Sequence, residues 1–165
     1  MTREIPLGLR GKSGMVALVD EQDFEMLMKY SKTWCFHKHQ RRCFCIKKGV
    51  YTLMHRVIMN PPKGMEVDHI NGDCLDNRRC NLRVCTGAEN CKNRPMRPSN
   101  TTGFKGVVRR DNNRKNPYTS SIKSDGKLHH LGYYPTPEAA AAAYNEAAKR
   151  LHGEFARLNV IPQTT

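Results

Sequence analysis

The sequence predicts an α+β protein made of two small units, each combining short antiparallel strands with a helix. Its 165 residues suit one ordinary domain or two small ones. Residues 65–94 have the pattern strand, loop, strand, helix, and residues 103–159 have the pattern of three short strands followed by one helix. Between them, residues 95–102 contain two prolines and no apolar period, which is typical of a linker.

The segment 13–60 is expected to extend the first unit with further strands. Alternating apolar residues favour a strand over 15–19, and apolar residues at helical spacing favour a helix over 20–30. Residues 43–46 and 50–53 flank a Lys-Lys-Gly turn, which is typical of a hairpin. The two cysteines of the first hairpin strand alternate along it, so they are expected to face the same side, either the core or a partner surface.

The second unit carries the clearest helix signal in the chain. Thr136 is expected to be its N-cap, Pro137 suits the first helical position, and Gly153 suits the C-cap. One face of this helix is apolar and consists of Ala140, Tyr144, Ala147, Ala148 and Leu151. The three preceding strands are expected at 104–108, 118–122 and 128–131, with turns at 111–113 and 124–127.

The charge balance indicates a polyanionic partner. The chain has 28 Lys and Arg against 15 Asp and Glu, a formal net charge of +13. Nucleic acid is the first candidate, because each neutralised phosphate releases a counterion. No apolar run is long enough to span a membrane, and the N-terminus lacks the apolar core of a signal peptide. Seven irregularly spaced cysteines favour reduced thiols in a cytoplasm.

Polar groups suited to chemistry gather in residues 65–94. An Asp-His pair, Asp68-His69, ends an apolar strand and is followed by a long polar loop. Strand character resumes at Asn81, and Thr86 with Glu89 forms a capping box. A helix is therefore expected to start at Gly87 and to carry Asn90 on its first turn.

This segment resembles the HNH nuclease family over about residues 51–94. The matching motifs are Leu53-Met54-His55-Arg56, Val67-Asp68-His69-Ile70-Asn71-Gly72, Leu75-Asp76-Asn77-Arg78, Asn81-Leu82-Arg83 and Glu89-Asn90-Cys91-Lys92-Asn93. It is similar to the phage and intron-homing branch, in which the last motif position is Asn, here Asn90, rather than His. The resemblance implies a ββα-metal module, with two strands, one helix and one metal ion.

Chemistry and resemblance together suggest roles for the motif residues. His69 is expected to be the general base, because a neutral imidazole accepts a proton from water near pH 7. Asn81 matches the family position that orients this ring. Asp68 and Asn90 are expected to offer oxygen ligands to a single Mg²⁺ or Mn²⁺ ion. His55 is a possible accessory residue near the site, or equally a core histidine.

A structural zinc site is not expected. Four cysteines fall within 18 residues, with five, four and five residues between successive members: Cys74, Cys80, Cys85 and Cys91. Zinc sites in related nucleases use two Cys-x-x-Cys pairs, in which each pair shares a tight turn.

Residues 103–159 resemble the Apetala-two/ethylene-response-factor DNA-binding domain. The matching pieces are Gly103-Phe104-Lys105-Gly106-Val107, Leu131-Gly132-Tyr133-Tyr134, Pro137-Glu138-Ala139-Ala140, Ala143-Tyr144, Ala147-Ala148 and Gly153-Glu154-Phe155-Ala156-Arg157-Leu158-Asn159. The resemblance implies a small three-stranded antiparallel sheet packed on one helix, with the sheet lying in the DNA major groove. Members of that family carry Trp in the early strands, near Tyr118 here, so base preference is not transferred.

Basic residues in both units are candidates for DNA contacts. The candidates are Arg78 and Arg83 in the first unit and Arg109, Arg110, Arg114 and Lys123 in the second. The expected domains are a nuclease domain over 1–94 with its core at 51–94, a linker over 95–102, a DNA-binding domain over 103–159 and a tail over 160–165.

The leading functional hypothesis is a metal-dependent DNA endonuclease that nicks double-stranded DNA, targeted by its second unit, in the cytoplasm of a bacterial or phage-infected host cell. No membrane partner is expected. One alternative is a non-catalytic DNA-binding or transcription factor that keeps the HNH segment as a scaffold. Another is a zinc-stabilised interaction protein. The target site, monomer or dimer state, and single- or double-strand cutting stay open.

Overall fold

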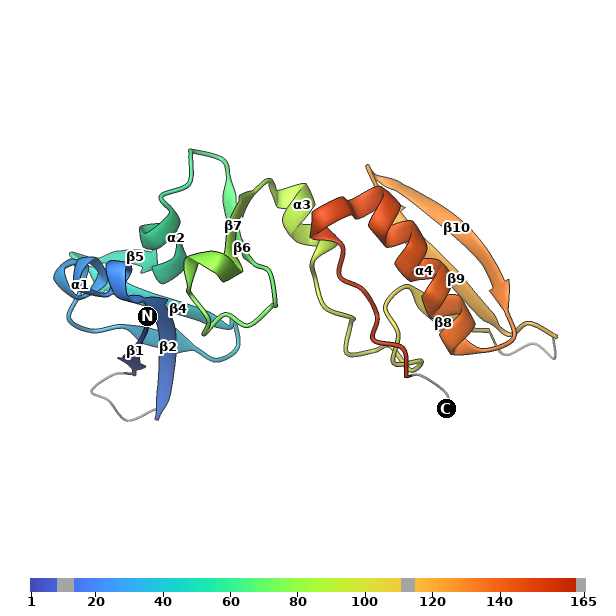
Figure 1. Ribbon diagram of the computed structural model, residues 1–165, viewed down its shortest axis with the longest axis horizontal. Helices are drawn as coiled ribbons and strands as arrows, with labels where there is room; N and C mark the ends of the chain where they lie inside the picture. The colour runs from blue at the N-terminus through green and yellow to red at the C-terminus, as the bar shows by residue number, and fades with distance from the viewer. Residues whose placement is uncertain (9–13, 111–114, 163–165) are drawn as a thin grey trace. The chain divides into compact units, whose positions relative to one another are not determined.

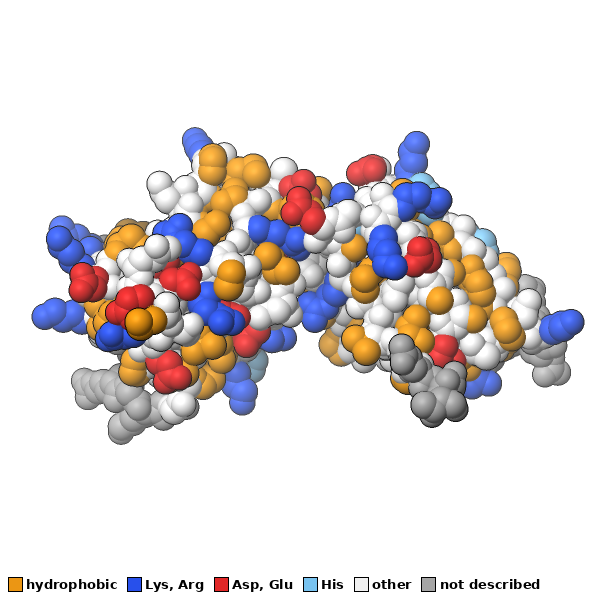
Figure 2. Space-filling view, viewed as in Figure 1, with side chains coloured by type: hydrophobic (Ala, Val, Ile, Leu, Met, Phe, Trp, Pro, Cys, Tyr) orange, Lys and Arg blue, Asp and Glu red, His pale blue; other side chains and the backbone are white. Residues whose placement is uncertain are grey.

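The computed structural model describes residues 1–8, 14–110 and 115–162 (Figure 1). The chain divides into two compact units, Met1–Asn90 and Cys91–Thr165, and each is described by itself. Lys and Arg side chains cover parts of the surface of both units (Figure 2). Among the described residues, no helix has the length and apolar character needed to cross a membrane.

In its described part, the first unit contains three small antiparallel sheets. Their strands are β1 (Thr2–Leu7) with β2 (Met15–Asp20), β3 (Cys35–His37) with β4 (Arg42–Lys47) and β5 (Val50–Leu53), and β6 (Glu66–His69) with β7 (Leu82–Cys85). The helices are α1 (Glu21–Tyr30), α2 (Met54–Met59), the 3-10 turn η2 (Arg79–Asn81) and α3 (Gly87–Lys92). The sequence patterns indicated β2, α1, the β4–β5 hairpin and the order β6, loop, β7, α3, whereas β1, β3 and α2 were not anticipated.

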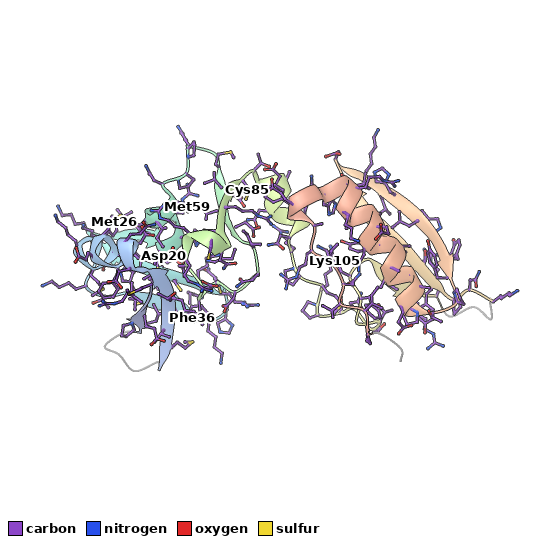
Figure 3. The ribbon with its side chains drawn as sticks, viewed as in Figure 1. Asp20, Met26, Phe36, Met59, Cys85 and Lys105 are labelled. Carbon is purple, nitrogen blue, oxygen red and sulfur yellow. The ribbon has the colours of Figure 1, made fainter. Side chains whose placement is uncertain are left out.

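One hydrophobic core holds the elements of the first unit together. Its fully buried members include Leu7, Leu27, Trp34 and Met54. The Trp34 indole Nε1 donates a hydrogen bond to the Leu27 carbonyl at 3.2 Å, which satisfies the polar atom of this buried ring. Phe36 of β3, labelled in Figure 3, packs against the same core. This core supports the sheets from which the polar residues of 65–94 project.

The segment made of β1, β2 and α1, here called the N-terminal extension, also holds the polar loop between β6 and β7. Leu18 of β2 donates from its backbone NH to the Leu75 carbonyl at 2.8 Å and accepts from the Asn77 NH at 2.7 Å. Arg79 donates from Nε and Nη2 to the two carboxylate oxygens of buried Asp23 at 2.8 and 2.7 Å. The loop is therefore attached to β2 and α1, which lie far from it in the sequence.

In the second unit, a three-stranded antiparallel sheet packs on one helix. The elements are β8 (Val107–Arg109), β9 (Tyr118–Ser124), β10 (Lys127–Tyr134), α4 (Pro137–His152) and the 3-10 turn η3 (Gly153–Phe155), with sheet order β10-β9-β8. Ile122 of β9 packs against Tyr144 and Ala148 of α4. The Thr136 side chain accepts from the Ala139 NH at 3.2 Å, which confirms the expected N-cap. The turn expected at 111–113 lies outside the described residues.

The first strand of this sheet starts at Val107 rather than at Phe104. Gly106 directly before it has a positive φ of 78°, which favours glycine. A Cβ at this position would lie 2.1 Å from Cδ2 of Tyr144 and 2.7 Å from the Ser121 carbonyl oxygen. Gly106 therefore allows the chain to turn closely against α4 before β8 begins.

We expect Gly106→Ala to destabilise the second unit by about 3 kcal/mol or more, because backbone strain and overpacking add. Urea denaturation monitored by circular dichroism measures the loss. Gly126→Ala is the matched control, since Gly126 has the same φ of 78° but open space around its Cβ position. Equal losses in the two variants would contradict the close contact with Tyr144.

Candidate active site

The Asp-His pair lies at the end of β6, where the strand meets the polar loop. Asp68 faces Arg83 of β7 across the sheet, and His69 faces Leu82. Because successive side chains of a strand point to opposite faces, Asp68 and His69 are directed to different surroundings. The two groups are neighbours in the chain but belong to two distinct sets of contacts.

The Asp68 side of β6 carries several side-chain oxygens that could ligate a cation. Glu66, two residues before Asp68, lies on the same face of the strand. The Asn90 amide Nδ2 of α3 donates to Oε2 of Glu66, so Asn90 is next to that face. The pKa of the Cys85 thiol is raised to about 11 by burial and by the nearby carboxylates of Asp68, Glu66 and Glu89. This negative surrounding favours a cation.

Helix α3 begins where the capping box requires. The Thr86 hydroxyl accepts from the Glu89 NH at 3.2 Å, and the Glu89 carboxylate accepts from the Thr86 NH at 2.7 Å. This confirms the expected start at Gly87. The cap fixes the first turn of the helix, and with it the position of Asn90.

Asp68 forms a largely buried ion pair with Arg83. Its Oδ2 accepts from Nε of Arg83 at 3.0 Å and from Nη2 at 2.7 Å, and the two side chains are only 8% and 12% exposed. A carboxylate at this depth needs a compensating charge, which the guanidinium supplies. Arg83, expected as a phosphate contact, is therefore directed to a candidate metal ligand in this structure.

His69 lies in a partly buried polar pocket on the other side of β6. Its Nε2 is 3.3 Å from Oδ1 of Asn77, and its ring meets the His55 ring edge-on with centroids 5.1 Å apart. Burial lowers the pKa of His69, against the opposing effect of the Asn77 hydrogen bond. Burial, followed by the neighbouring His69, lowers the pKa of His55 to about 3. Both imidazoles are therefore neutral at pH 7.

The asparagine that contacts His69 is Asn77, not the expected Asn81. The Asn81 amide Nδ2 donates to the Asp76 carbonyl at 2.8 Å, and its Oδ1 accepts from the Asn71 NH at 3.0 Å. Asn81 directly precedes β7. Its side-chain amide bonds two backbone groups of the β6–β7 loop and not the His69 ring. Asn77 is fully buried, and its Nδ2 donates to the Cys74 carbonyl at 3.1 Å. The sequence signal for Asn77 was its place in the motif Leu75-Asp76-Asn77-Arg78 of the HNH resemblance. The same residue type is also common in ordinary turns.

Arg78, another expected phosphate contact, stabilises the same loop. Its Nε and Nη2 each donate to one carboxylate oxygen of Asp76 at 2.7 Å. Asn71 Nδ2 donates to the same carboxylate at 3.2 Å. The hydrogen bond from Arg78 is the main cause that lowers the pKa of Asp76. The Arg78 side chain is still 36% exposed, so one edge of it faces solvent.

The cysteines are free thiols with different surroundings. Cys43, Cys45 and Cys85 are buried, whereas Cys80 and Cys91 are exposed. Cys43 and Cys45 of β4 face the first unit's core, which decides the alternative left open by their spacing. Within the ranges that the structure describes, no group of three or more His, Cys, Asp or Glu side chains is placed to hold a metal ion.

The basic residues expected on the second unit's sheet do not share one surface. Val107 and Arg109 alternate with Val108, and Arg109 pairs with Tyr118 on the side that faces α4. Lys123 lies on the opposite, open side. The alternation of β8 and β9 therefore places Arg109 and Lys123, both candidates for DNA contacts, on opposite sides of the sheet.

Two of the remaining expected contacts are only partly defined. Arg110 follows β8 and donates its backbone NH to the Pro117 carbonyl at 2.8 Å, with an exposed side chain. Arg114 lies outside the described residues. The open side of the sheet also carries His130 and Tyr133, whose rings meet edge-on with centroids 4.8 Å apart.

Lys105, labelled in Figure 3, has a structural role that the sequence did not reveal. Its Nζ donates to the Lys92 carbonyl at 2.6 Å, and burial, followed by nearby Arg157, lowers its pKa to about 8. The Asn159 side chain accepts from the Lys105 NH at 2.6 Å and donates to the Lys105 carbonyl at 3.1 Å. These bonds tie the segment before β8 to the residues after α4.

Comparison with known proteins agrees with the motifs around β6, β7 and α3. A family model described as HNH endonuclease matches residues 53–92. Protein 3.8 of Escherichia phage T7 is 33% identical over 96 residues, which cover 58% of this chain and 77% of that protein. The chain therefore contains an HNH endonuclease family domain over residues 53–92.

A second relative extends the match within this family. A protein of Acanthamoeba polyphaga mimivirus, named as an uncharacterized HNH endonuclease, is 36% identical over 116 residues. The match covers 70% of this chain and 57% of the viral protein, so the chain spans little more than half of that relative. No solved structure shows a significant match to the chain.

The lowered pKa values of His55 and His69 predict that acid destabilises the first unit. Above pH 6.5 both imidazoles are neutral in the folded and unfolded states, so they add no pH dependence. As the pH falls below 6.5, the unfolded chain binds protons that the folded protein takes up only at a lower pH, about 3 for His55. Stability is therefore lost as the pH falls.

Urea denaturation at several pH values between 4 and 7, with EDTA present, measures this slope. The variant His55→Gln lacks one group that binds a proton in the unfolded chain but not in the folded protein. Its slope of unfolding free energy against pH is therefore expected to be shallower by up to about 1.4 kcal/mol per pH unit. An unchanged slope would show that His55 does not stay neutral in the folded protein.

Proposed function

We propose that this protein is a metal-dependent DNA endonuclease that hydrolyses one phosphodiester bond at each visit. The observation that carries the proposal is a partly buried, neutral imidazole at the end of β6, beside a strand face that carries carboxylate and amide oxygens. Hydrolysis of a phosphodiester needs a base for water and a stabiliser of phosphate charge. His69 suits the first role, and Asp68 with Asn90 suits the second.

The contacts of Asn77 assign the proton on His69. Because Nδ2 of Asn77 donates to the Cys74 carbonyl, its Oδ1 is the acceptor that faces His69 Nε2 at 3.3 Å. The neutral ring therefore carries its proton on Nε2 and its lone pair on Nδ1. In the proposed reaction Nδ1 accepts the proton of the attacking water, and the imidazolium so formed keeps its hydrogen bond to Asn77.

The oxygen donors on the Asp68 side fit a hard divalent cation. Asp68 and Asn90 would hold Mg²⁺ or Mn²⁺, with Glu66 adding negative charge on the same strand face. When bound, the ion stabilises the charge that develops on the phosphate and on the leaving oxygen. Asp68 would exchange its ion pair with Arg83 for the metal, and Arg83 would then be released to contact a phosphate.

The second unit is proposed to hold the DNA duplex. Its sheet has one face packed on α4 and one open face, which carries Lys123 and the ring pair His130 and Tyr133. A sheet of this size fits the major groove. In this proposal the first unit cleaves the DNA and the second unit binds it.

One observation favours a second candidate function, a DNA-binding protein without catalysis. Arg83 donates two hydrogen bonds to Oδ2 of Asp68, so its guanidinium already neutralises the charge of that carboxylate. If the pair never opens, no metal binds, and the first unit serves only as a scaffold. The two functions make different predictions for cleavage and for metal binding.

We expect the protein to nick supercoiled plasmid DNA in Mg²⁺, and we expect EDTA to abolish nicking. His69→Ala should lower the nicking rate by about 10²- to 10⁴-fold, because the general base is lost. The same variant should bind DNA as wild type does in a gel shift. Binding without nicking in the wild-type protein, on plasmids that include its own genomic neighbourhood, would favour the non-catalytic alternative.

Arg83→Gln is expected to tighten Mn²⁺ binding about tenfold, a change of about 1.4 kcal/mol, since the cation no longer displaces a guanidinium. Isothermal titration of the metal-free protein, without DNA, measures this affinity. Arg78→Gln is the matched control, because Arg78 pairs with Asp76 in the loop instead. Asp68→Asn should abolish the binding. An Arg83→Gln affinity equal to that of wild type would argue against metal binding at Asp68.

A further inference from the structure

A long stretch of the first unit is basic and contains no acidic residue. Residues 26–65 hold nine Lys and Arg and no Asp or Glu. Five of these basic side chains lie close together in the sequence and are exposed: Lys38, Arg41, Arg42, Lys47 and Lys48. Among the described residues, none of these five forms an ion pair. Their charge is therefore not balanced within the protein.

The sheet β3-β4-β5 has one face that points away from the core. Of the five basic residues, Arg42 lies on this face, whereas Lys38, Arg41 and Lys48 lie in the turns at its ends. Lys47 alternates to the other side, with its Nζ 4.4 Å from the centroid of the Tyr30 ring. Cys43 and Cys45 of β4 are 1% exposed and face the core, so Arg42, Phe44 and Ile46 alternate onto the outer face. We call this the outer face of the β3-β4-β5 sheet. Arg42 lies at one end of β4, and Lys48 lies in the turn beyond the other end.

Aromatic and apolar side chains lie between these charges. Tyr51 of β5 pairs with Ile46, and its ring stacks on Phe44 with centroids 4.6 Å apart. His37 of β3 pairs with Arg42, and its ring centroid is 6.4 Å from that of Phe44. Ile46 is 65% exposed and Tyr51 44% exposed, so this strip is open to solvent.

The inner side of the same sheet contacts the candidate active-site loop. The Cys43 thiol donates to the Cys74 carbonyl at 3.2 Å and accepts from Nδ2 of Asn77 at 3.8 Å. Arg41 Nη2 lies 3.5 Å from the Gly72 carbonyl oxygen. Asn77 is the residue that holds His69. The basic sheet and the proposed catalytic imidazole are therefore linked by a few direct contacts.

We infer that the outer face of the β3-β4-β5 sheet binds the phosphate backbone of the DNA that flanks the cleaved bond. This inference rests on the proposed function. Unbalanced positive charge finds its complement in phosphates, and each contact gains free energy by releasing a counterion. A β-ribbon fits into the major groove, and the six residues of β4 span about 20 Å of it. The exposed strip around Tyr51 and Ile46 then meets sugars and base edges.

The test compares two doubly substituted full-length proteins that lose the same charge. Arg42→Gln/Lys48→Gln neutralises the two ends of the outer face. Lys29→Gln/Lys63→Gln, the matched control, removes two exposed charges of the same acid-free stretch that lie in α1 and in the loop after α2. Fluorescence anisotropy with a labelled duplex, in EDTA so that no cleavage occurs, gives the affinity from 50 to 300 mM salt. Thermal denaturation confirms that each variant is folded.

For Arg42→Gln/Lys48→Gln, the slope of log affinity against log salt should be smaller by about 1.8 than in wild type, the effect of two lost phosphate contacts. The control should change the slope by less than half as much. Equal slopes in the two variants would overturn the inference, although DNA binding itself would stand. Failure of the wild-type protein to bind any duplex would instead overturn the proposed function.

Discussion

The attachment of the β6–β7 loop to the N-terminal extension is the constraint on which the rest of the site depends. The loop is polar and has no hydrophobic core of its own, so its backbone groups need partners elsewhere. Leu18 supplies two backbone hydrogen bonds, and buried Asp23 holds Arg79 through two more. Loss of Arg79 would leave the carboxylate of Asp23, whose side chain is only 4% exposed, without its counter-charge, which is destabilising. The extension therefore fixes Asn77, and through it the His69 ring.

The alternation of β6 divides the chemistry of the site between its two faces. His69 is held among Asn77 and His55, where burial keeps the imidazole neutral. Asp68 is directed to the side where the carboxylates raise the pKa of Cys85 and where Arg83 supplies the counter-charge. A neutral imidazole and a charged carboxylate thus stand one residue apart without sharing a pocket. This arrangement suits a reaction that needs both an unprotonated imidazole and a bound cation.

The sequence predicted the features that depend on neighbouring residues and missed those that depend on distant ones. The capping box at Thr86 and the N-cap at Thr136 follow from local hydrogen bonding, and both were predicted correctly. Asn77, and not Asn81, contacts His69 because of the way the twelve-residue loop between β6 and β7 folds. The spacing of residues in the sequence does not specify this. The separation of Arg109 from Lys123 likewise depends on strand register. The salt bridge from Arg83 to Asp68 needs both strands paired, so neither residue alone signals it.

We expect cleavage to depend on the hold of the N-terminal extension on the β6–β7 loop, which a double-mutant cycle at Asp23 and Arg79 measures. The nicking rate in Mg²⁺ and the DNA affinity in EDTA would be measured for Asp23→Ala, Arg79→Ala and the double variant, at a temperature where all are folded. We expect each single variant to nick at least about tenfold more slowly, the double variant to show little further loss, and the DNA affinity to stay unchanged, because the two residues act through one contact. Wild-type nicking rates in both folded single variants would contradict it.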